Sequence, residues 1–370
     1  MSYDPFERGP FPVGVRTEAW HDERRDRVLT VEVWYPVREE HRGQDLDEVS
    51  QDIFTVEGMS GSGGSRSRQA AVRDARPRTE AFPAILLVHG YAGHRRESTF
   101  MGTHLASHGF LVVSADHAGS TYKDIASVME STRAEGRRIT RTELMPALFV
   151  DRKGDVPFLI DQAVARLGAE PTRMGITGAS LGGWTSVMAP GVEPRIKAIA
   201  PMCPSGGETP VYPPGKNHAS DALNFAWGSD VAALFMVADR DSWLPLYGQL
   251  ELFGRVPGAK RMIILRRADH QHFIDDIAYG HEFLRDFTRS LAEIETEGGV
   301  DWGAIASAIA PYDELCPGDH AQLCWRGVCA AHMDAQVKQS AAAAAFLDGD
   351  LVGELAKRGI DAEQIWRSAG

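Results

Sequence analysis

The sequence predicts an α/β fold in which a doubly wound, mostly parallel sheet carries helices on both faces. Apolar runs of strand length occur at residues 84–88, 110–114, 196–200, 232–237 and 262–265, and the short run 172–177 is expected to be a further buried strand. Stretches of helical character separate several of these runs, at residues 99–107, 155–167 and 184–189. Strands that are apolar on both faces are typical of a parallel sheet, because helices cover both of its surfaces. We therefore expect functional residues just after these strands, at the carboxyl edge of the sheet.

Composition narrows the range of functions. The chain has 370 residues, 43% hydrophobic and 24% charged, which is typical of a soluble globular protein, and we expect one domain over residues 1–370. A net charge of -12 argues against a nucleic-acid partner, since phosphates attract basic surfaces. Residues 1–8 contain no apolar signal segment and no later run has the length of a membrane span, so we expect a cytoplasmic protein.

The N-terminal part has a different pattern from the rest of the chain. Residues 11–18 and 28–35 alternate apolar and polar side chains, which predicts antiparallel edge strands. The alternation is lost over residues 42–80, where residues 59–68 are rich in Gly and Ser, as linkers are. We expect residues 42–80 to be a mobile insertion in the domain.

Two later segments interrupt the alternation of strands and helices. Residues 204–230 are rich in Pro, Gly and Ser, and residues 297–330 carry three of the four cysteines. Insertions after strands commonly form lids or pocket walls, and a structural excursion on the surface is the alternative. Residues 336–347, with five consecutive alanines, predict a single packed outer helix.

The motif that organises the chain is Gly178-Ala179-Ser180-Leu181-Gly182-Gly183. It follows a predicted strand and precedes a predicted helix, the context of a nucleophile elbow. The tight turn strains the serine backbone, and side chains two residues to either side would clash, which explains the two flanking glycines. We expect Ser180 to be a nucleophile, and we expect the N–H of Leu181, at the helix N-terminus, to bind an oxyanion.

A serine nucleophile needs a base, and the base needs a carboxylate that fixes its tautomer. In folds with this elbow the acid follows the serine and the base comes last. The strand at 232–237 is followed by Asp239 and Asp241. We prefer Asp241, because it is the last acidic residue before a helix that starts near Pro245, and Asp239 is the alternative. An aspartate here can also cap that helix.

The candidate base comes from the end of the next strand, at residues 262–265, which is followed by His270 and His272. We prefer His270, because it lies closer to the strand end. His272, beside Phe273, can pack underneath.

The second oxyanion donor is expected from the loop His89-Gly90-Tyr91-Ala92-Gly93, which follows the strand at 84–88. Glycines at 90 and 93 let the backbone approach a substrate, so the N–H of Tyr91 is the candidate donor. The Tyr91 ring is either a wall of the acyl pocket or an ordinary packed loop residue.

These motifs together resemble the α/β-hydrolase superfamily, over about residues 12–280. The sequences Leu105-Ala106-Ser107-His108-Gly109-Phe110 and His270-Gln271-His272-Phe273 resemble the platelet-activating factor acetylhydrolase and predicted dienelactone hydrolase branch. The sequences Gly90-Tyr91-Ala92-Gly93 and Ala238-Asp239-Arg240-Asp241-Ser242-Trp243-Leu244-Pro245 are similar to bacterial cutinase-like polyester hydrolases. In the latter branch the second aspartate of such a segment is the triad acid, and this resemblance implies the same role for Asp241.

We therefore expect a serine carboxylesterase that acts through an acyl-enzyme on short-to-medium acyl esters, with small-molecule substrates and no cofactor. An amidase or peptidase with the same triad is one alternative. A non-catalytic, ligand-binding member of the fold is another, although all three triad positions are filled.

A group of possible metal ligands occurs late in the sequence, and we favour buried thiols over a metal there, because the spacing lacks the close Cys-x-x-Cys pairs of zinc sites. The group consists of Cys316, His320, Cys324, Cys329 and His332.

Several other residues near strand ends are expected to be structural. We expect Asp116 and His117 to make structural hydrogen bonds and Cys203 to be a small buried apolar residue. Trp184 and Trp243 are expected to pack in the core, and Trp243 has the alternative role of lining the leaving-group side.

Overall fold

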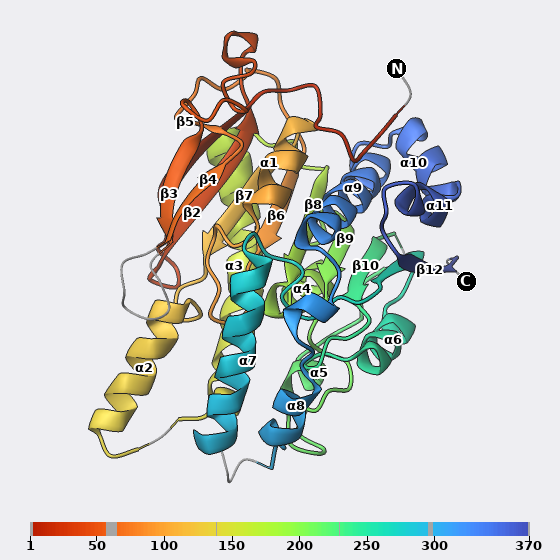
Figure 1. Cartoon of the computed structure of the whole chain (residues 1–370). Coiled ribbons are helices and arrows are strands. Elements are labelled where there is room, and N and C mark those ends of the chain that lie inside the picture. The colour runs from red at the N-terminus through yellow and green to blue at the C-terminus, as the bar shows by residue number, and fades with distance from the viewer. Residues whose placement is uncertain (1–2, 57–64, 138, 229, 295–298, 369–370) are drawn as a thin grey trace.

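The computed structural model describes residues 3–56, 65–137, 139–228, 230–294 and 299–368 (Figure 1). Within these residues ten strands form one sheet, in the order β12-β11-β10-β9-β8-β6-β7-β2-β1-β5. The predicted fold class is confirmed, because the six central strands run parallel and helices flank the sheet. These strands are β6 (Ala84–Val88), β7 (Leu111–Asp116), β8 (Met174–Ala179), β9 (Ile196–Met202), β10 (Ala232–Ala238) and β11 (Lys260–Leu265).

Antiparallel strands complete both edges of the sheet. The predicted N-terminal strands are β1 (Val13–Asp22) and β2 (Arg27–Pro36), which pair with each other, and β2 pairs with β7. The short β5 (Val72–Arg73) pairs with β1, and β12 (Ala362–Arg367) covers the opposite edge beside β11. The sequence did not predict β12, which lies near the C-terminus in Figure 1.

The two faces of the sheet carry separate apolar cores. Leu86 packs in one core with residues of α3 (Arg141–Leu167), α4 (Leu181–Met188) and α6 (Leu246–Arg255). Its neighbour Leu87 packs in the other core, with α1 (Thr99–Ser107), α9 (Gly318–Gln336), α10 (Ala341–Asp348) and α11 (Leu351–Ala356). Because successive side chains of a strand point to opposite faces, an unbroken apolar run is what this arrangement requires.

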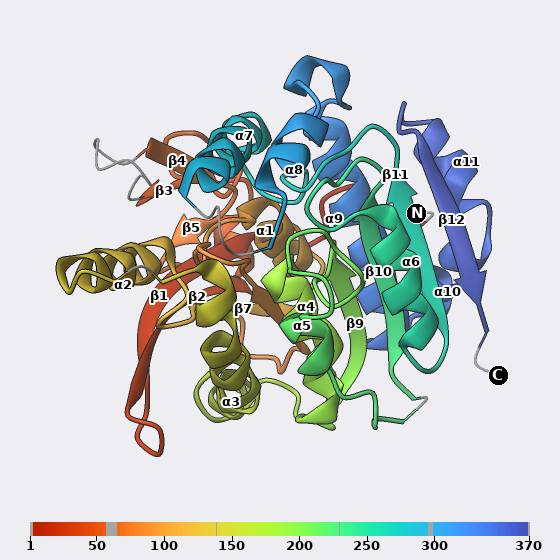
Figure 2. The ribbon, with the colours of Figure 1, turned by 90° about the horizontal axis from the view of Figure 1, so that it is seen from below.

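The remaining helices lie outside these two layers or connect them. The helices α7 (Ile277–Ile294) and α8 (Trp302–Ala308) lie side by side, and α2 (Tyr122–Ala134) projects away from the sheet in both views (Figures 1 and 2). The short α5 (His218–Asp221) packs near α3. Short 3₁₀ turns are η1 (Glu39–His41), η2 (Ala189–Gly191) and η3 (Tyr312–Glu314). None of the described helices is both long and apolar enough to cross a lipid bilayer.

Two helices differ from their predicted bounds. The helix expected at 155–167 begins at Arg141, where the Thr140 hydroxyl and the Glu143 carboxylate form a reciprocal capping box. Pro146 and Pro157 lie inside this helix, and interior prolines normally indicate an end. The packed helix expected at 336–347 is present as α10, but it begins at Ala341, because α9 ends at Gln336 and Gln339 has a φ of 59°.

The insertion at residues 42–80 contains the antiparallel pair β3 (Asp52–Val56) and β4 (Ser65–Gln69). Residues 65–68, expected as part of a linker, therefore lie in a strand, and residues 57–64 lie outside the described residues. A buried hydrogen bond of 2.6 Å joins the Gln69 amide to Asp52, and another of 2.6 Å joins the Trp34 indole N–H to Gln69. These bonds attach the pair to β2, and the expected mobility of the insertion stays a prediction.

The first turn of α4 lies directly against the end of β6. A Cβ atom added to Gly182 would lie 1.9 Å from the carbonyl oxygen of Val88, and one added to Gly178 would lie 2.2 Å from the same oxygen. A backbone carbonyl at the end of a sheet strand cannot rotate away. The expected steric need for glycine at both positions is therefore confirmed.

Replacing Gly182 with alanine should lower the free energy of unfolding by about 3 kcal/mol, the upper part of the overpacking range, because only a backbone shift relieves the contact. The matched control is Gly254→Ala in α6, where no atom lies within 4 Å of an added Cβ. That change should raise the free energy of unfolding by about 0.5–1 kcal/mol through helix propensity. Urea unfolding of the three proteins measures both values, and similar values for the two variants would contradict the steric argument.

Candidate active site

Ser180 occupies the turn between β8 and α4. Its backbone has φ 57° and ψ -112°, a conformation that non-glycine residues rarely adopt. The turn is held on both sides, since the Ser180 N–H donates to the Met202 carbonyl at 2.9 Å and the Trp184 N–H donates to the Ser180 carbonyl at 2.9 Å. The strained turn leaves the hydroxyl partly exposed at the carboxyl edge of the sheet.

The structure brings Ser180, His270 and Asp241 into one hydrogen-bonded chain. The Ser180 Oγ lies 3.1 Å from His270 Nε2, and His270 Nδ1 lies 2.8 Å from Asp241 Oδ2. The three residues come from the ends of β8, β11 and β10, which are far apart in the sequence. Such a chain lets a histidine take a hydroxyl proton while a carboxylate stabilises the imidazolium.

The Asp241 side chain is fixed by its own loop. Its Oδ1 accepts the backbone N–H groups of Trp243 at 2.9 Å and Leu244 at 2.7 Å, which leaves Oδ2 for His270. The helix expected near Pro245 is α6, whose N-cap is Pro245. The Trp243 ring stacks on the His270 imidazole, with centroids 6.0 Å apart and planes 27° apart. Both the carboxylate and the imidazole are thus held in one orientation.

The charge of Asp241 also sets the basicity of His270. Burial alone would lower the pKa of His270, but the Asp241 carboxylate outweighs burial and holds the pKa well above its usual value. The imidazole therefore takes up a proton readily, as a base at this position must.

The alternative acid and base make other contacts. Asp239 accepts the Ala268 N–H at 3.2 Å and pairs with Arg266 at 3.4 Å. His272 Nδ1 accepts the N–H of Asp269 at 3.0 Å, its Nε2 lies 3.3 Å from the Cys316 carbonyl, and burial lowers its pKa to about 4. Both side chains serve the loops that carry Asp241 and His270.

The loop at residues 89–93 lies beside the serine. A Cβ added to Gly90 would lie 3.5 Å from the Cβ of Ser180, so the backbone passes at van der Waals distance. The Gly90 N–H donates to the Glu97 carboxylate at 2.7 Å, and burial raises the pKa of Glu97 to about 7. Tyr91 follows Gly90 directly, and Leu181 is the first residue of α4. Their N–H groups as oxyanion donors stay a prediction.

Arg152 supports this loop from inside the molecule. Its side chain is fully buried on α3, and its guanidinium donates to the His89 carbonyl at 3.1 Å and to the Ser120 hydroxyl at 2.7 Å. The Ser120 carbonyl in turn accepts the N–H of Ala92 at 3.1 Å. Burial lowers the pKa of Arg152 to about 10, so the group stays charged at neutral pH. Sequence reasoning missed Arg152, because nothing in a helix sequence marks it as the support of a loop.

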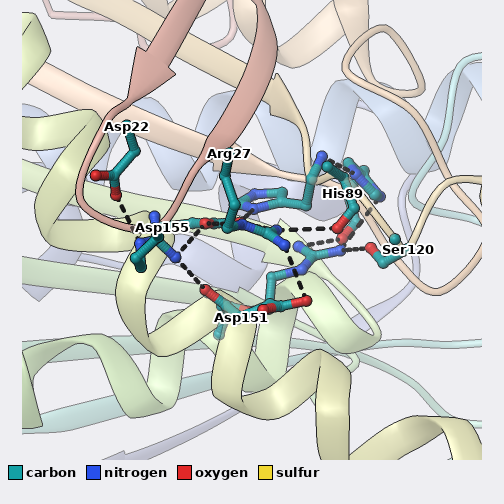
Figure 3. A network of polar contacts seen from close by, with 12 residues as sticks. Asp22, Arg27, His89, Ser120, Asp151 and Asp155 are labelled. Carbon is teal, nitrogen blue, oxygen red and sulfur yellow. Dashed lines mark hydrogen bonds and ion pairs between the residues drawn. The ribbon is translucent and has the colours of Figure 1, made fainter.

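Asp155, one turn along the same helix, is the centre of the neighbouring ion-pair network (Figure 3). Its carboxylate lies 2.8 Å from His117 Nδ1, 2.8 Å from an Arg25 nitrogen and 3.2 Å from an Arg27 nitrogen. The expected structural hydrogen bonding of His117 is confirmed. The His117 N–H donates to His89 at 3.1 Å, so the network reaches the same loop.

Two further buried groups adjoin the candidate triad. The Asp269 carboxylate accepts the His270 N–H at 2.6 Å, and burial together with Asp241 raises the pKa of Asp269 to about 7. Cys203 is buried as expected, and burial raises the pKa of its thiol. Its sulfur, an Asp241 oxygen and a His270 nitrogen lie within 4.8 Å of one another, which the sequence did not predict.

The late group of cysteines and histidines is distributed along the fold. Cys324 and Cys329 are buried on α9 in the apolar core, and Cys316 precedes that helix. Within the described ranges, this group brings no three ligand atoms within 4.8 Å of one another.

The two segments expected as lids or walls pack against the site. The Trp184 indole donates to the Ala219 carbonyl at 2.8 Å, which ties residues 204–230 to α4. The Trp325 indole donates to the His272 carbonyl at 2.8 Å, which ties the second segment to the histidine loop. Residues 229, 297 and 298 of these segments lie outside the described residues. A lid function stays a prediction.

Comparisons with known proteins give one family match and a structural likeness. A family model described as PET hydrolase-like matches residues 48–275. Among solved structures, a ferulic acid esterase from Streptomyces cinnamoneus is similar to this chain, with a TM-score of 0.56 and 20% identity over 89% of this chain and 91% of that chain. At this identity the likeness shows a shared fold. No curated protein matches the chain.

Replacing Arg152 with glutamine should lower the free energy of unfolding by about 3 kcal/mol, because the change removes the buried donor of the His89 carbonyl and the Ser120 hydroxyl. The matched control is Arg166→Gln on the same helix, where the exposed arginine bonds only to Gln162 among the described contacts. That variant should differ from the wild type by less than about 0.5 kcal/mol. Guanidinium unfolding measures both, and a loss below about 1 kcal/mol for Arg152→Gln would refute the supporting role.

Proposed function

This chain belongs to the PET hydrolase-like family, and on that basis we propose that it is a serine carboxylic-ester hydrolase that acts through an acyl-enzyme. Family membership supports an ester hydrolase. It also confirms the α/β-hydrolase superfamily and the cutinase-like resemblance. The observation that carries the serine mechanism is the hydrogen-bonded chain from Ser180 through His270 to Asp241.

In the proposed reaction the Ser180 Oγ attacks the ester carbonyl carbon while His270 Nε2 takes the hydroxyl proton. Collapse of the tetrahedral intermediate breaks the bond to the alcohol oxygen, and His270 returns the proton to that oxygen. Water then attacks the acyl-enzyme, with His270 again as base, and releases the carboxylic acid and free Ser180. Asp241 holds the imidazole tautomer and stabilises the imidazolium.

The oxyanion donors in this proposal are the backbone N–H groups of Tyr91 and Leu181. The first turn of a helix leaves its N–H groups without intrahelical partners, and the helix dipole favours negative charge there. Gly90 lies at van der Waals distance from Ser180, which supports the N–H of the next residue, Tyr91, as the second donor. Two donors on opposite sides of one carbonyl oxygen form the usual oxyanion site for acyl transfer.

The proposed substrates are small-molecule esters with short-to-medium acyl chains. Val211 and Tyr212 of the segment 204–230 pack into the core that contains α4, so we propose that this segment is a wall of the acyl pocket. The amidase and non-catalytic alternatives are outcomes of the labelling experiment below.

The pH dependence tests the roles of His270 and Asp241. Only the neutral imidazole can act as base, so kcat/KM should rise with pH, with its midpoint above the usual histidine value of 6.5 because Asp241 stabilises the protonated form. Removing that charge by Asp241→Asn should move the midpoint to lower pH and reduce kcat on the order of 10⁴-fold. The control Asp239→Asn should leave the midpoint unchanged. If Asp239→Asn shifts the midpoint and Asp241→Asn does not, the acid is assigned to the wrong aspartate.

The role of Ser180 is tested by Ser180→Ala, with Ser186→Ala as the matched control in the same helix. The Ser186 hydroxyl is buried and donates to the Gly182 carbonyl at 2.9 Å. Initial rates on 4-nitrophenyl acetate, butyrate, octanoate and palmitate should fall on the order of 10⁴- to 10⁶-fold in Ser180→Ala and only a few-fold in Ser186→Ala. The wild type should favour the shorter chains.

A fluorophosphonate probe should label the wild type and Ser186→Ala but not Ser180→Ala. Labelling without ester turnover would favour the amidase alternative. Absence of labelling in the wild type would favour a non-catalytic protein and would contradict the proposal.

A further inference from the structure

A buried cation lies beside the candidate triad. Arg141, the first residue of α3, is 6% exposed. Its guanidinium carbon lies 5.5 Å from the ring centre of Tyr91, 5.3 Å from that of Tyr212 and 5.4 Å from that of Trp243. These rings come from the loop at 89–93, the segment at 204–230 and the loop that carries Asp241. A positive charge is therefore held where the three loops around the site meet.

Two buried hydroxyl groups accompany this cation, and with the three rings they form what we call the Arg141 cluster. Ser205 and Tyr212 are each 3% exposed. In the part of the chain that the structure describes, neither hydroxyl oxygen has a partner in full hydrogen-bond geometry, although Ser205 and Arg141 lie close enough to Tyr212 to act on its pKa. Burial raises the pKa of Tyr212, and the Arg141 charge and the Ser205 hydroxyl act in the opposite direction, as expected for adjacent groups. Buried hydroxyls without partners are rare in native proteins and call for an explanation.

The Arg141 cluster is close to the reacting atoms. The Ser205 N–H donates to the Ser180 carbonyl at 3.2 Å, so this residue adjoins the nucleophile. Tyr91 provides a candidate oxyanion donor, and Trp243 stacks on His270. In a substrate, only a short run of carbon atoms would separate a group bound by the cluster from the ester carbonyl. We assign that group to the acyl part, because Tyr212 belongs to the segment 204–230 that we propose as the wall of the acyl pocket.

The chemistry of the cluster selects an anion. A guanidinium is a planar fork that matches the two oxygens of a carboxylate, and two hydroxyl donors add to it. The chain carries a net charge of -12, so a buried cation at the site is not part of a generally basic protein. The aromatic rings can pack against the hydrocarbon linker that joins the carboxylate of such a substrate to its ester.

We propose that the Arg141 cluster binds a carboxylate on the acyl part of the substrate, so that the preferred substrates are half-esters of dicarboxylic acids. This inference rests on the proposed esterase function. It deepens that function by naming the substrate class.

The kinetic test compares mono(4-nitrophenyl) adipate with the neutral 4-nitrophenyl hexanoate at pH 8. The wild type should favour the adipate half-ester by at least about 10-fold in kcat/KM. Arg141→Gln should reduce this ratio at least about 10-fold, mainly through the KM for the half-ester, and Tyr212→Phe, which keeps the ring, should reduce it about 3-fold. The charge-matched control is Arg289→Gln, an exposed arginine that bonds to Asp286 on α7, and it should leave both rates unchanged.

A binding test separates this inference from the proposed function. Calorimetric titration of Ser180→Ala with monoethyl adipate and with ethyl hexanoate measures recognition without turnover. Arg141-dependent binding of monoethyl adipate would support the anion site even if the wild type hydrolysed no ester. Equal binding of the two esters would overturn the inference, even with both hydrolysed. A wild-type ratio of kcat/KM for the two substrates near one would also overturn the inference. The same holds if Arg141→Gln loses kcat/KM equally on both substrates while its thermal unfolding midpoint is unchanged.

Discussion

The contact between Gly182 and the carbonyl oxygen of Val88 determines how closely α4 approaches the sheet. Because the two glycines of the elbow have no side chains to hold the helix away, the chain reverses within one residue, and Ser180 takes the positive φ that this reversal requires. The contact between Gly182 and Val88 also fixes where the loop at residues 89–93 begins. His89 follows Val88 directly, so the loop with Gly90 and Tyr91 leaves the sheet against the nucleophile. One steric constraint thus positions both Ser180 and one side of the proposed oxyanion site.

Two buried arginines then serve the loops around that elbow in different ways. Arg152 lies near acidic groups, and both Asp155 and Glu97 act on its charge across the interior. Its hydrogen bonds to the 89–93 loop and to Ser120 make it a support for a fixed backbone. Arg141 is instead surrounded by aromatic faces from three loops. Its guanidinium also donates to the Val211 carbonyl at 3.4 Å, so rings and backbone of the segment 204–230 together fix the position of the cation.

Most of the sheet and the three residues of the hydrogen-bonded chain could be predicted from sequence, for related physical reasons. Buried parallel strands need mostly apolar runs, and β8, β10 and β11 carry them, so the polar residues that follow these strands are conspicuous in the sequence. Elements that depend on tertiary packing could not be found this way. Pro146 and Pro157 lie inside α3, so the sequence indicates a later start for this helix. The edge strand β12 is mostly polar and has no apolar run that would predict it. Arg141 and Asp269 have no local pattern, because their surroundings come from distant segments.

The loop between β10 and α6 connects catalysis to recognition. Asp241 accepts two N–H groups from its own loop, so its position depends on where Trp243 sits. The Trp243 indole N–H donates to the Thr288 hydroxyl on α7 at 3.0 Å. The Trp243 ring also packs on Trp302, with ring centroids 5.5 Å apart. The same ring touches the His270 imidazole and the Arg141 guanidinium. Any movement of this tryptophan would therefore change the orientation of the base and the placement of the cation together. The helices α7 and α8, which share the apolar core of α4, thereby constrain the candidate site at the edge of the sheet.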